Sequence, residues 1–398
     1  MKKKKTWMKF RHRVVRNALY PVLYLYSRLR YGITIEKLPK AQQRQCVILY
    51  NHQTVFDQFF IGFAMGGPIY YMATEDIFSN GIVSSIIRYL VAPIPIKKQA
   101  TDIQAVRNCI SLAREGGTIA IAPEGNRTYS GKTEYINPAI AGLAKKLNLP
   151  IALFRIEGGY GIQPRWCDDI RRGKMRAYFS RIIEPSEYEE LDSEQLNEII
   201  CSELNVNEAK VDGTFRHKNL AEYLERAVYV CPKCGLSVFE SNRDTIECKK
   251  CGLKVRYFPT KELKGIDCEF PFRFINDWYE YQKEFVNNLD LKNYTDEPMY
   301  KDTANIQNVI VYKRKIPLYK NAKVLLFGDR VVLNEMTVPF EEIRAVSVLG
   351  RNKLNIYHGE NIYQLKGGKR FNALKYVNIF YRYKNISRGD INGKFLGL

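Results

Sequence analysis

A regular alternation of apolar runs and amphipathic segments between residues 45 and 185 constrains the fold of this chain more than any other feature. Apolar runs of strand length occupy residues 46–50, 68–73, 117–122, 150–156 and 175–183. Segments with helical spacing of apolar residues lie at 56–64, 81–90, 101–115 and 138–147, and residues 190–230 also look helical. This alternation predicts an α/β domain with a largely parallel or mixed sheet.

Four of the nine cysteines form a second strong pattern. They occur in the turns CPKCG and CKKCG, with thirteen residues between the pairs, at Cys231, Cys234, Cys248 and Cys251. Two such turns can place four thiolates around one tetrahedral metal ion, and the loop between them is long enough for a β-hairpin. We therefore expect a small zinc ribbon. Its zinc is structural and not catalytic, because four thiolates leave no open coordination position. Such a ribbon either binds other macromolecules or stabilises a linker that lacks its own core.

The last third of the chain predicts a β-rich region. A helix is expected at 274–289, followed by two stretches of alternating apolar and polar residues. These stretches turn at Gly328-Asp329 and at Gly359-Glu360, which are plausible hairpin turns. A final amphipathic helix is expected at 371–384. Strand meanders that end in one helix suggest a small barrel similar to a pleckstrin-homology (PH) domain.

The net charge of +20 is concentrated at the two ends of the sequence. Residues 1–50 carry +12 and residues 351–398 carry +8, so residues 51–350 are neutral overall. This distribution argues against a basic groove through the fold. It favours terminal segments that meet an anionic surface, either phospholipid or nucleic acid.

The N-terminal segment favours phospholipid. Eight of its first 16 residues are basic, and they alternate with apolar side chains such as Trp7 and Phe10. The following apolar stretch, residues 19–25, contains Pro21 and is shorter than the about 20 residues that a membrane span needs. We expect no signal peptide and read the segment as a pair of helices in the membrane interface. A packed amphipathic hairpin with a solvated basic face is the alternative.

The stretch NHQTVFD, residues 51–57, brings a histidine and an aspartate to the end of the first predicted strand. Thr54 fits the N-cap of the next helix, with Asp57 at its third position. His52 lies in the turn, where ligands approach open α/β sheets. An ionised carboxylate that receives one imidazole N–H leaves the other nitrogen as a base. A capping aspartate beside an unrelated loop histidine explains this stretch equally well.

A second polar stretch, PEGNRT, follows the strand at residues 117–122. Arg127 offers a bidentate donor for phosphate, Gly125 permits close backbone approach, and Glu124 can hold a hydroxyl or orient the arginine. Lys97 and Lys98, after another apolar run, add cationic groups. The two polar stretches together favour a catalytic dyad over a simple helix cap.

Together these stretches resemble the blocks of the membrane-bound glycerophospholipid acyltransferases, in particular the 1-acyl-glycerol-3-phosphate (lysophosphatidate) acyltransferases. His52 and Asp57 match the family's His-x4-Asp block, while Glu124, Gly125 and Arg127 match its Glu-Gly-x-Arg block. The resemblance covers roughly residues 10–215. A middle and a later block depart from the family, which usually has arginine where this chain has Lys97 or Lys98 and proline where it has Leu153.

The resemblance implies an enzyme that acylates a lysophospholipid. His52, oriented by Asp57, would activate the acceptor hydroxyl towards an acyl thioester of coenzyme A or acyl carrier protein. Arg127 and Glu124, with Lys97 or Lys98, would hold the acceptor phosphate. The partners expected are therefore a phospholipid surface, a lysophospholipid acceptor and an acyl donor, with no nucleic acid.

Two other functions are consistent with parts of the sequence. An inactive membrane-tethered adaptor would use the ribbon and tail to recruit partners, but the intact blocks argue against it. A nucleic-acid-binding ribbon protein would need a basic ribbon, whereas residues 231–251 carry a net charge of only +1.

The expected organisation has five segments, and the protein is expected at the cytoplasmic face of the cell membrane as a peripheral, monotopic protein. The other five cysteines, which lack motif spacing, suggest reduced thiols in the cytosol. The segments are basic membrane-interface helices at 1–44, an α/β acyltransferase domain at 45–228, a zinc ribbon at 229–257, a helical connector at 258–315 and a PH-like β domain with a C-terminal helix at 316–398.

Overall fold

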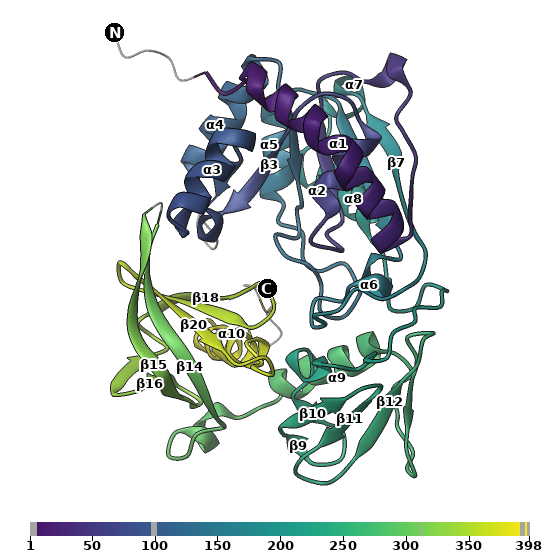
Figure 1. Cartoon of the computed structure of the whole chain (residues 1–398). Helices are drawn as coiled ribbons and strands as arrows, with labels where there is room; N and C mark the ends of the chain where they lie inside the picture. The colour runs from purple at the N-terminus through teal and green to yellow at the C-terminus, as the bar shows by residue number, and fades with distance from the viewer. Residues whose placement is uncertain (1–5, 97–101, 312, 391–394, 396–398) are drawn as a thin grey trace. The chain divides into compact units, whose positions relative to one another are not determined.

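The computed structural model describes residues 6–96, 102–311, 313–390 and 395, and the chain divides into two compact units (Figure 1). The first unit comprises Met1–Pro164 and Ile170–Phe215, and the second comprises Arg165–Asp169 and Arg216–Leu398. The α/β unit therefore ends before the boundary expected at residue 228. The reason is local, because the turn Leu224–Arg226 bonds to residues of the second unit.

The first unit is built on a seven-stranded mixed sheet. All of its strand pairs are parallel except β6 with β7, which is antiparallel. The five expected strands are present, and two three-residue strands, β1 and β4, add to them because they are too short to show a sequence period. In sheet order the strands are β1 (Ile33–Ile35), β7 (Met175–Ile183), β6 (Ile151–Glu157), β2 (Val47–Tyr50), β5 (Thr118–Ile121), β3 (Ile69–Thr74) and β4 (Ile94–Ile96).

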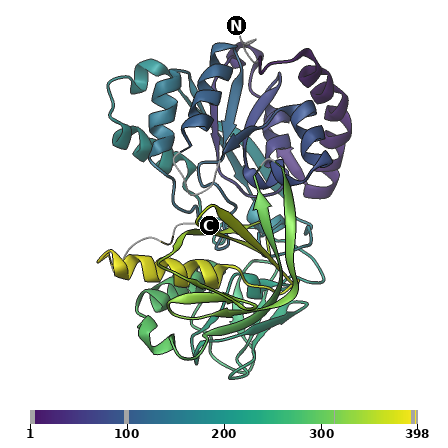
Figure 2. The ribbon, with the colours of Figure 1, turned by 90° about the vertical axis from the view of Figure 1, so that its left-hand side faces the viewer.

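Helices cover both faces of this sheet (Figure 2). Alternate residues of β2 point to opposite faces: Val47 and Leu49 belong to the same buried cluster as residues of α4, α5 and α8, while Ile48 and Tyr50 join residues of α2. The four expected helices are present, but only one long helix lies within 190–230, where residues 208–210 and 218–223 form turns. The helices are α2 (Asp57–Ala64), α3 (Ile82–Val91), α4 (Ile103–Arg114), α5 (Ala139–Leu147), α6 (Gly159–Ile162), α7 (Pro185–Tyr188) and α8 (Ser193–Leu204).

The N-terminal segment forms one helix, α1 (Phe10–Tyr31), and not the expected pair. Pro21 lies inside it, and a proline in a helix interior costs about 3 kcal/mol. Packing offsets this cost, because the rings of Tyr20 and Tyr24 both meet Phe63 of α2 edge to face. No helix among the described residues is long and apolar enough to cross a bilayer.

The second unit begins with a small antiparallel sheet and a helix. The strands β10 (Phe239–Asn242) and β11 (Thr245–Cys248) form the hairpin expected between the cysteine pairs. The region expected as a helical connector, 258–315, is mostly not helical, and it contains α9 (Ile275–Asn287) and the start of a second sheet. The remaining strands of the small region are β8 (Val230–Cys231), β9 (Gly235–Leu236), β12 (Lys254–Tyr257) and β13 (Leu263–Gly265).

The second sheet has seven antiparallel strands and begins at Tyr300, earlier than the expected boundary at residue 316. Both expected hairpin turns are found, between β15 and β16 and between β19 and β20. The last helix, α10 (Leu374–Ser387), packs on the sheet, where Phe380 meets Phe340 edge to face. In sheet order the strands are β17 (Met336–Pro339), β16 (Arg330–Leu333), β15 (Arg314–Leu326), β14 (Tyr300–Ile310), β20 (Asn361–Gly367), β19 (Lys353–His358) and β18 (Ile343–Leu349). Its PH-like identity stays a prediction.

Gly161 should be irreplaceable for steric reasons. A Cβ atom there would lie 2.3 Å from two ring atoms of the buried Phe215, which itself packs in the core beside α2. We expect Gly161→Ala to lower the free energy of unfolding by about 1–3 kcal/mol, measured by urea titration. Gly142→Ala in α5 is the matched control, because the atom nearest to its Cβ would be Ser193 Oγ, at 4.0 Å. An equal effect of the two substitutions would contradict the argument.

Candidate active site

The turn between β2 and α2 brings His52 and Asp57 into direct contact. His52 Nδ1 lies 2.8 Å from Asp57 Oδ2. The helix begins at Asp57 itself, with Phe56 as its N-cap residue, so the expectation that Thr54 caps the helix and Asp57 is its third residue is wrong. The two residues before the helix form a turn that separates Thr54 from it.

The Asp57 carboxylate is fully buried and organises this turn. Oδ2 accepts a hydrogen bond from Gln53 N at 2.7 Å, and Oδ1 accepts one from Thr54 N at 2.9 Å and one from the Thr54 hydroxyl at 2.6 Å. Because these neighbours all donate, the carboxylate acts as an acceptor, and His52 Nδ1 carries the proton in their contact. The bond orients the ring and leaves Nε2 as the nitrogen with a lone pair.

Asn51 fixes the same turn to the neighbouring strand, and the sequence analysis missed it. Its Nδ2 donates to the carbonyl of Ile156 at 2.8 Å, and its Oδ1 accepts from Ile156 N at 2.8 Å. The side chain thus imitates a strand partner where β2 ends. The signal available in the sequence was an asparagine directly after a predicted strand.

Glu124 joins the two polar stretches. Its Oε1 accepts the backbone N–H of His52 at 3.1 Å, and its Oε2 accepts that of Glu134 at 3.1 Å. Burial raises the pKa of the Glu124 carboxyl to about 8, and the two backbone donors only partly oppose this shift. In the structure Glu124 therefore supports the loops, and both of its oxygens are already engaged.

Of the other expected phosphate ligands, the structure describes Arg127 and Gly125. Arg127 is buried, and its Nη1 donates to the carbonyl of Gln163 at 3.3 Å. Gly125 has a φ of +70°, and a Cβ atom on it would meet no atom within 4 Å. The backbone there is thus open to approach. Lys97 and Lys98 lie outside the described residues.

Comparison with known proteins identifies this part of the chain. Residues 32–157 match the family model described as Acyltransferase. This segment is an acyltransferase domain. It contains both polar stretches, so the resemblance seen in the sequence is confirmed at the level of the family.

The acyltransferase domain is also similar to curated plant proteins. One is the chloroplastic 1-acyl-sn-glycerol-3-phosphate acyltransferase BAT2 of Brassica napus, 22% identical over 195 residues, which are 48% of this chain and 55% of that protein. Another is the chloroplastic enzyme LPAT1 of Arabidopsis thaliana, 21% identical, with 48% and 53% covered. The match therefore spans about half of each relative.

One solved structure is similar to the same region. It is the 1-acyl-sn-glycerophosphate (LPA) acyltransferase PlsC of Thermotoga maritima, at 21% identity and a TM-score of 0.38, with 50% of this chain and 82% of that chain covered. The second unit lies wholly outside the family match, which ends at residue 157.

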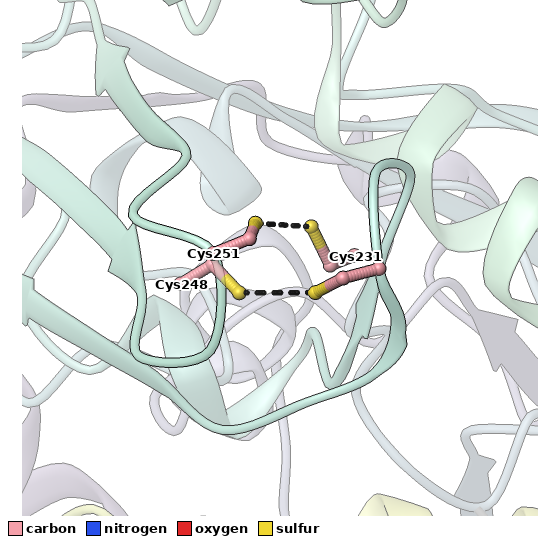
Figure 3. A group of neighbouring side chains, drawn as sticks. Cys231, Cys248 and Cys251 are labelled. Carbon is pink, nitrogen blue, oxygen red and sulfur yellow. Dashed lines mark hydrogen bonds between the residues drawn. The ribbon is translucent and has the colours of Figure 1, made fainter.

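The four motif cysteines of the second unit converge (Figure 3). The Sγ atoms of Cys231 and Cys251 lie 3.6 Å apart, and those of Cys234 and Cys248 lie 3.5 Å apart. All four Sγ atoms fall within 4.8 Å of one another. Tetrahedral zinc with Zn–S bonds of about 2.3 Å needs sulfur atoms about 3.8 Å apart, so this donor set fits a zinc ion.

The raised pKa of Glu124 predicts a pH dependence of stability. At pH values between the ordinary carboxyl pKa and the raised pKa of about 8, Glu124 keeps its proton in the folded protein and has released it in the unfolded chain. Stability should therefore fall as the pH rises through this window, by about 5 kcal/mol. Urea unfolding near the two ends of the window measures this loss. Glu124→Gln, which does not titrate, should lose less, and equal losses would contradict the assignment.

Proposed function

We propose that this chain transfers an acyl group from a thioester of coenzyme A or acyl carrier protein to the free hydroxyl of lysophosphatidate, which yields phosphatidate. The acyltransferase domain and the activity for which the two plant relatives are named support this reaction class. The observation that carries the proposal is the contact of His52 Nδ1 with the buried Asp57 carboxylate at 2.8 Å.

In the proposed mechanism His52 acts as the general base. Its Nε2 removes the proton of the acceptor hydroxyl while the oxygen attacks the thioester carbonyl. A C–O bond forms, the C–S bond breaks, and the imidazolium returns the proton to the departing thiolate. Asp57 holds the ring and stabilises its cationic form. This direct transfer needs no acyl-enzyme.

The phosphate of the acceptor would bind near the second polar stretch. Arg127 supplies a guanidinium, whose planar geometry matches phosphate oxygens, and Gly125 leaves its backbone accessible. Lys97 and Lys98 are proposed as further cationic groups, and Glu124 is proposed to contribute by keeping both loops in place. The same side of the sheet, where β2 and β5 end, would thus bind the base and the phosphate.

Replacement of His52 tests the mechanism. A positioned base contributes about 10² to 10⁴ in rate, so His52→Ala should keep at most about 1% of the activity and remain folded. The assay is acyl transfer from a long-chain acyl thioester to lysophosphatidate in detergent or liposomes.

His358→Ala provides a matched control for this experiment. His358 Nε2 also contacts a carboxylate, Glu342 Oε2, at 2.8 Å, and its side chain is 27% exposed against 25% for His52. This control should retain full activity. Near wild-type turnover in folded His52→Ala would contradict the role of His52 as the general base. If the wild type acylates no lysophospholipid, the inactive adaptor becomes the better reading.

We further propose that the first unit rests on a phospholipid surface at the cytoplasmic face of the membrane. Exposed apolar side chains project from α1, where Phe10 is 81% and Leu29 78% exposed, and from α3, where Ile82 is 80% exposed. The two helices touch, since Arg11 Nε donates to the carbonyl of Tyr89 at 2.7 Å. Apolar side chains beside arginines suit an interfacial helix on anionic lipid.

The four motif cysteines are proposed to bind one structural zinc ion. Their spacing and their sulfur–sulfur distances support this, and the metal would replace the hydrophobic core that such a small region lacks. Four thiolate ligands leave no position for substrate, so we propose no catalytic role for the metal.

Metal analysis tests this site. The purified protein should contain about one zinc per chain, and Cys234→Ser should lose it together with several degrees of thermal stability. Cys268→Ser is the matched control, because Cys268 is exposed and lies outside the cluster. Absence of zinc from the wild type, or loss of zinc in the control alone, would contradict the proposal.

A further inference from the structure

Gln163 contacts both candidate motifs through two different groups. Its side-chain Oε1 accepts a hydrogen bond from the backbone N–H of Val55, at 3.3 Å, inside the turn between His52 and Asp57. Its main-chain oxygen accepts the bond from Arg127 Nη1 at 3.3 Å. The residue is 2% exposed, so bulk water competes little for either contact.

The short helix α6 presses Gln163 against the turn. Gln163 N donates to the carbonyl of Gly159 at 2.8 Å, which ends the helix. A Cβ atom on Gly159 would lie 2.4 Å from Gln53 Cβ and 3.3 Å from Thr54 Cγ2. The glycine therefore permits an approach to the turn that no larger residue allows.

The chain directly after Gln163 is held in the second unit. Residues Arg165–Asp169 belong to that unit, where Trp166 is fully buried and meets the ring of Tyr257 edge to face. Arg226 Nη1 donates to the carbonyl of Trp166 at 2.9 Å and to the Asp168 carboxylate at 2.6 Å. Only Pro164 separates Gln163 from this segment.

The chain then returns to the first unit and closes on α6. Arg171 N donates to the carbonyl of Ile162 at 2.9 Å, and Arg171 Nη1 donates to that of Gly161 at 3.3 Å. Gln163 thus lies at the end of a helix that packs on the turn. Contacts within the first unit fix its position.

We propose that Gln163 is a positioning residue that holds the His52–Asp57 turn in register with Arg127. The proposal rests on the proposed acyl transfer.

The first test replaces the side-chain acceptor. Gln163→Met keeps the length but loses the oxygen, so kcat should fall about tenfold, the effect of about 1.4 kcal/mol of lost transition-state stabilisation. The acceptor KM should stay unchanged, because the main-chain oxygen still receives Arg127. Gln163→Glu, which keeps an acceptor, should recover most of kcat. Gln104→Met, on the exposed side of α4, is the matched control.

Amide hydrogen exchange separates this proposal from the proposed reaction. Exchange of the peptide covering residues 51–58 should rise in Gln163→Met and not in Gln104→Met. If the wild type shows no acyl transfer but the exchange still rises, the contact stands and the reaction fails. Unchanged exchange, or a loss of kcat that Gln163→Glu does not recover, overturns the positioning role.

Discussion

The buried Asp57 carboxylate is the group on which the candidate site depends. A carboxylate removed from water must replace its lost hydration with donors, and here it takes them from the turn that precedes it. Two backbone N–H groups and a hydroxyl fix the path of the chain, and that path brings the His52 ring to the remaining side of the same carboxylate. The orientation of the ring is therefore a consequence of satisfying one buried charge.

The sheet then determines what lies opposite this turn. Strands β2 and β5 are parallel neighbours, with Leu49 beside Ile121, so their carboxyl ends open at the same edge. The two polar stretches leave from that edge, and the Glu124 carboxyl joins them by accepting the N–H of His52. This contact buries the Glu124 carboxyl, and burial raises its pKa. The carboxyl therefore stabilises the two loops and is not free to bind a ligand.

The second unit is an addition with its own architecture. Its cysteine cluster and its antiparallel sheet lie outside the acyltransferase match. The second unit nevertheless includes five residues, Arg165–Asp169, that interrupt the sequence of the first unit. In the sequence only Pro164 separates these residues from Gln163. The second unit is thus made of two separate stretches of the sequence, and the shorter one lies between the two stretches of the first unit. A domain simply appended at the C-terminus would be one continuous stretch.

The sequence alone determined the elements and the chemistry of the motifs. The period of apolar residues located the main strands and helices, since burial on one or both faces imposes that period. The cysteine spacing located the cluster, because the turn that brings two thiolates together is local. Only the tertiary structure decided that α1 is a single helix despite Pro21, that Asp57 begins its helix, and that Asn51 and Gln163 brace the turn. The partners of Asn51 and Gln163 lie about a hundred residues away along the chain. A contact between such distant residues leaves no local period in the sequence.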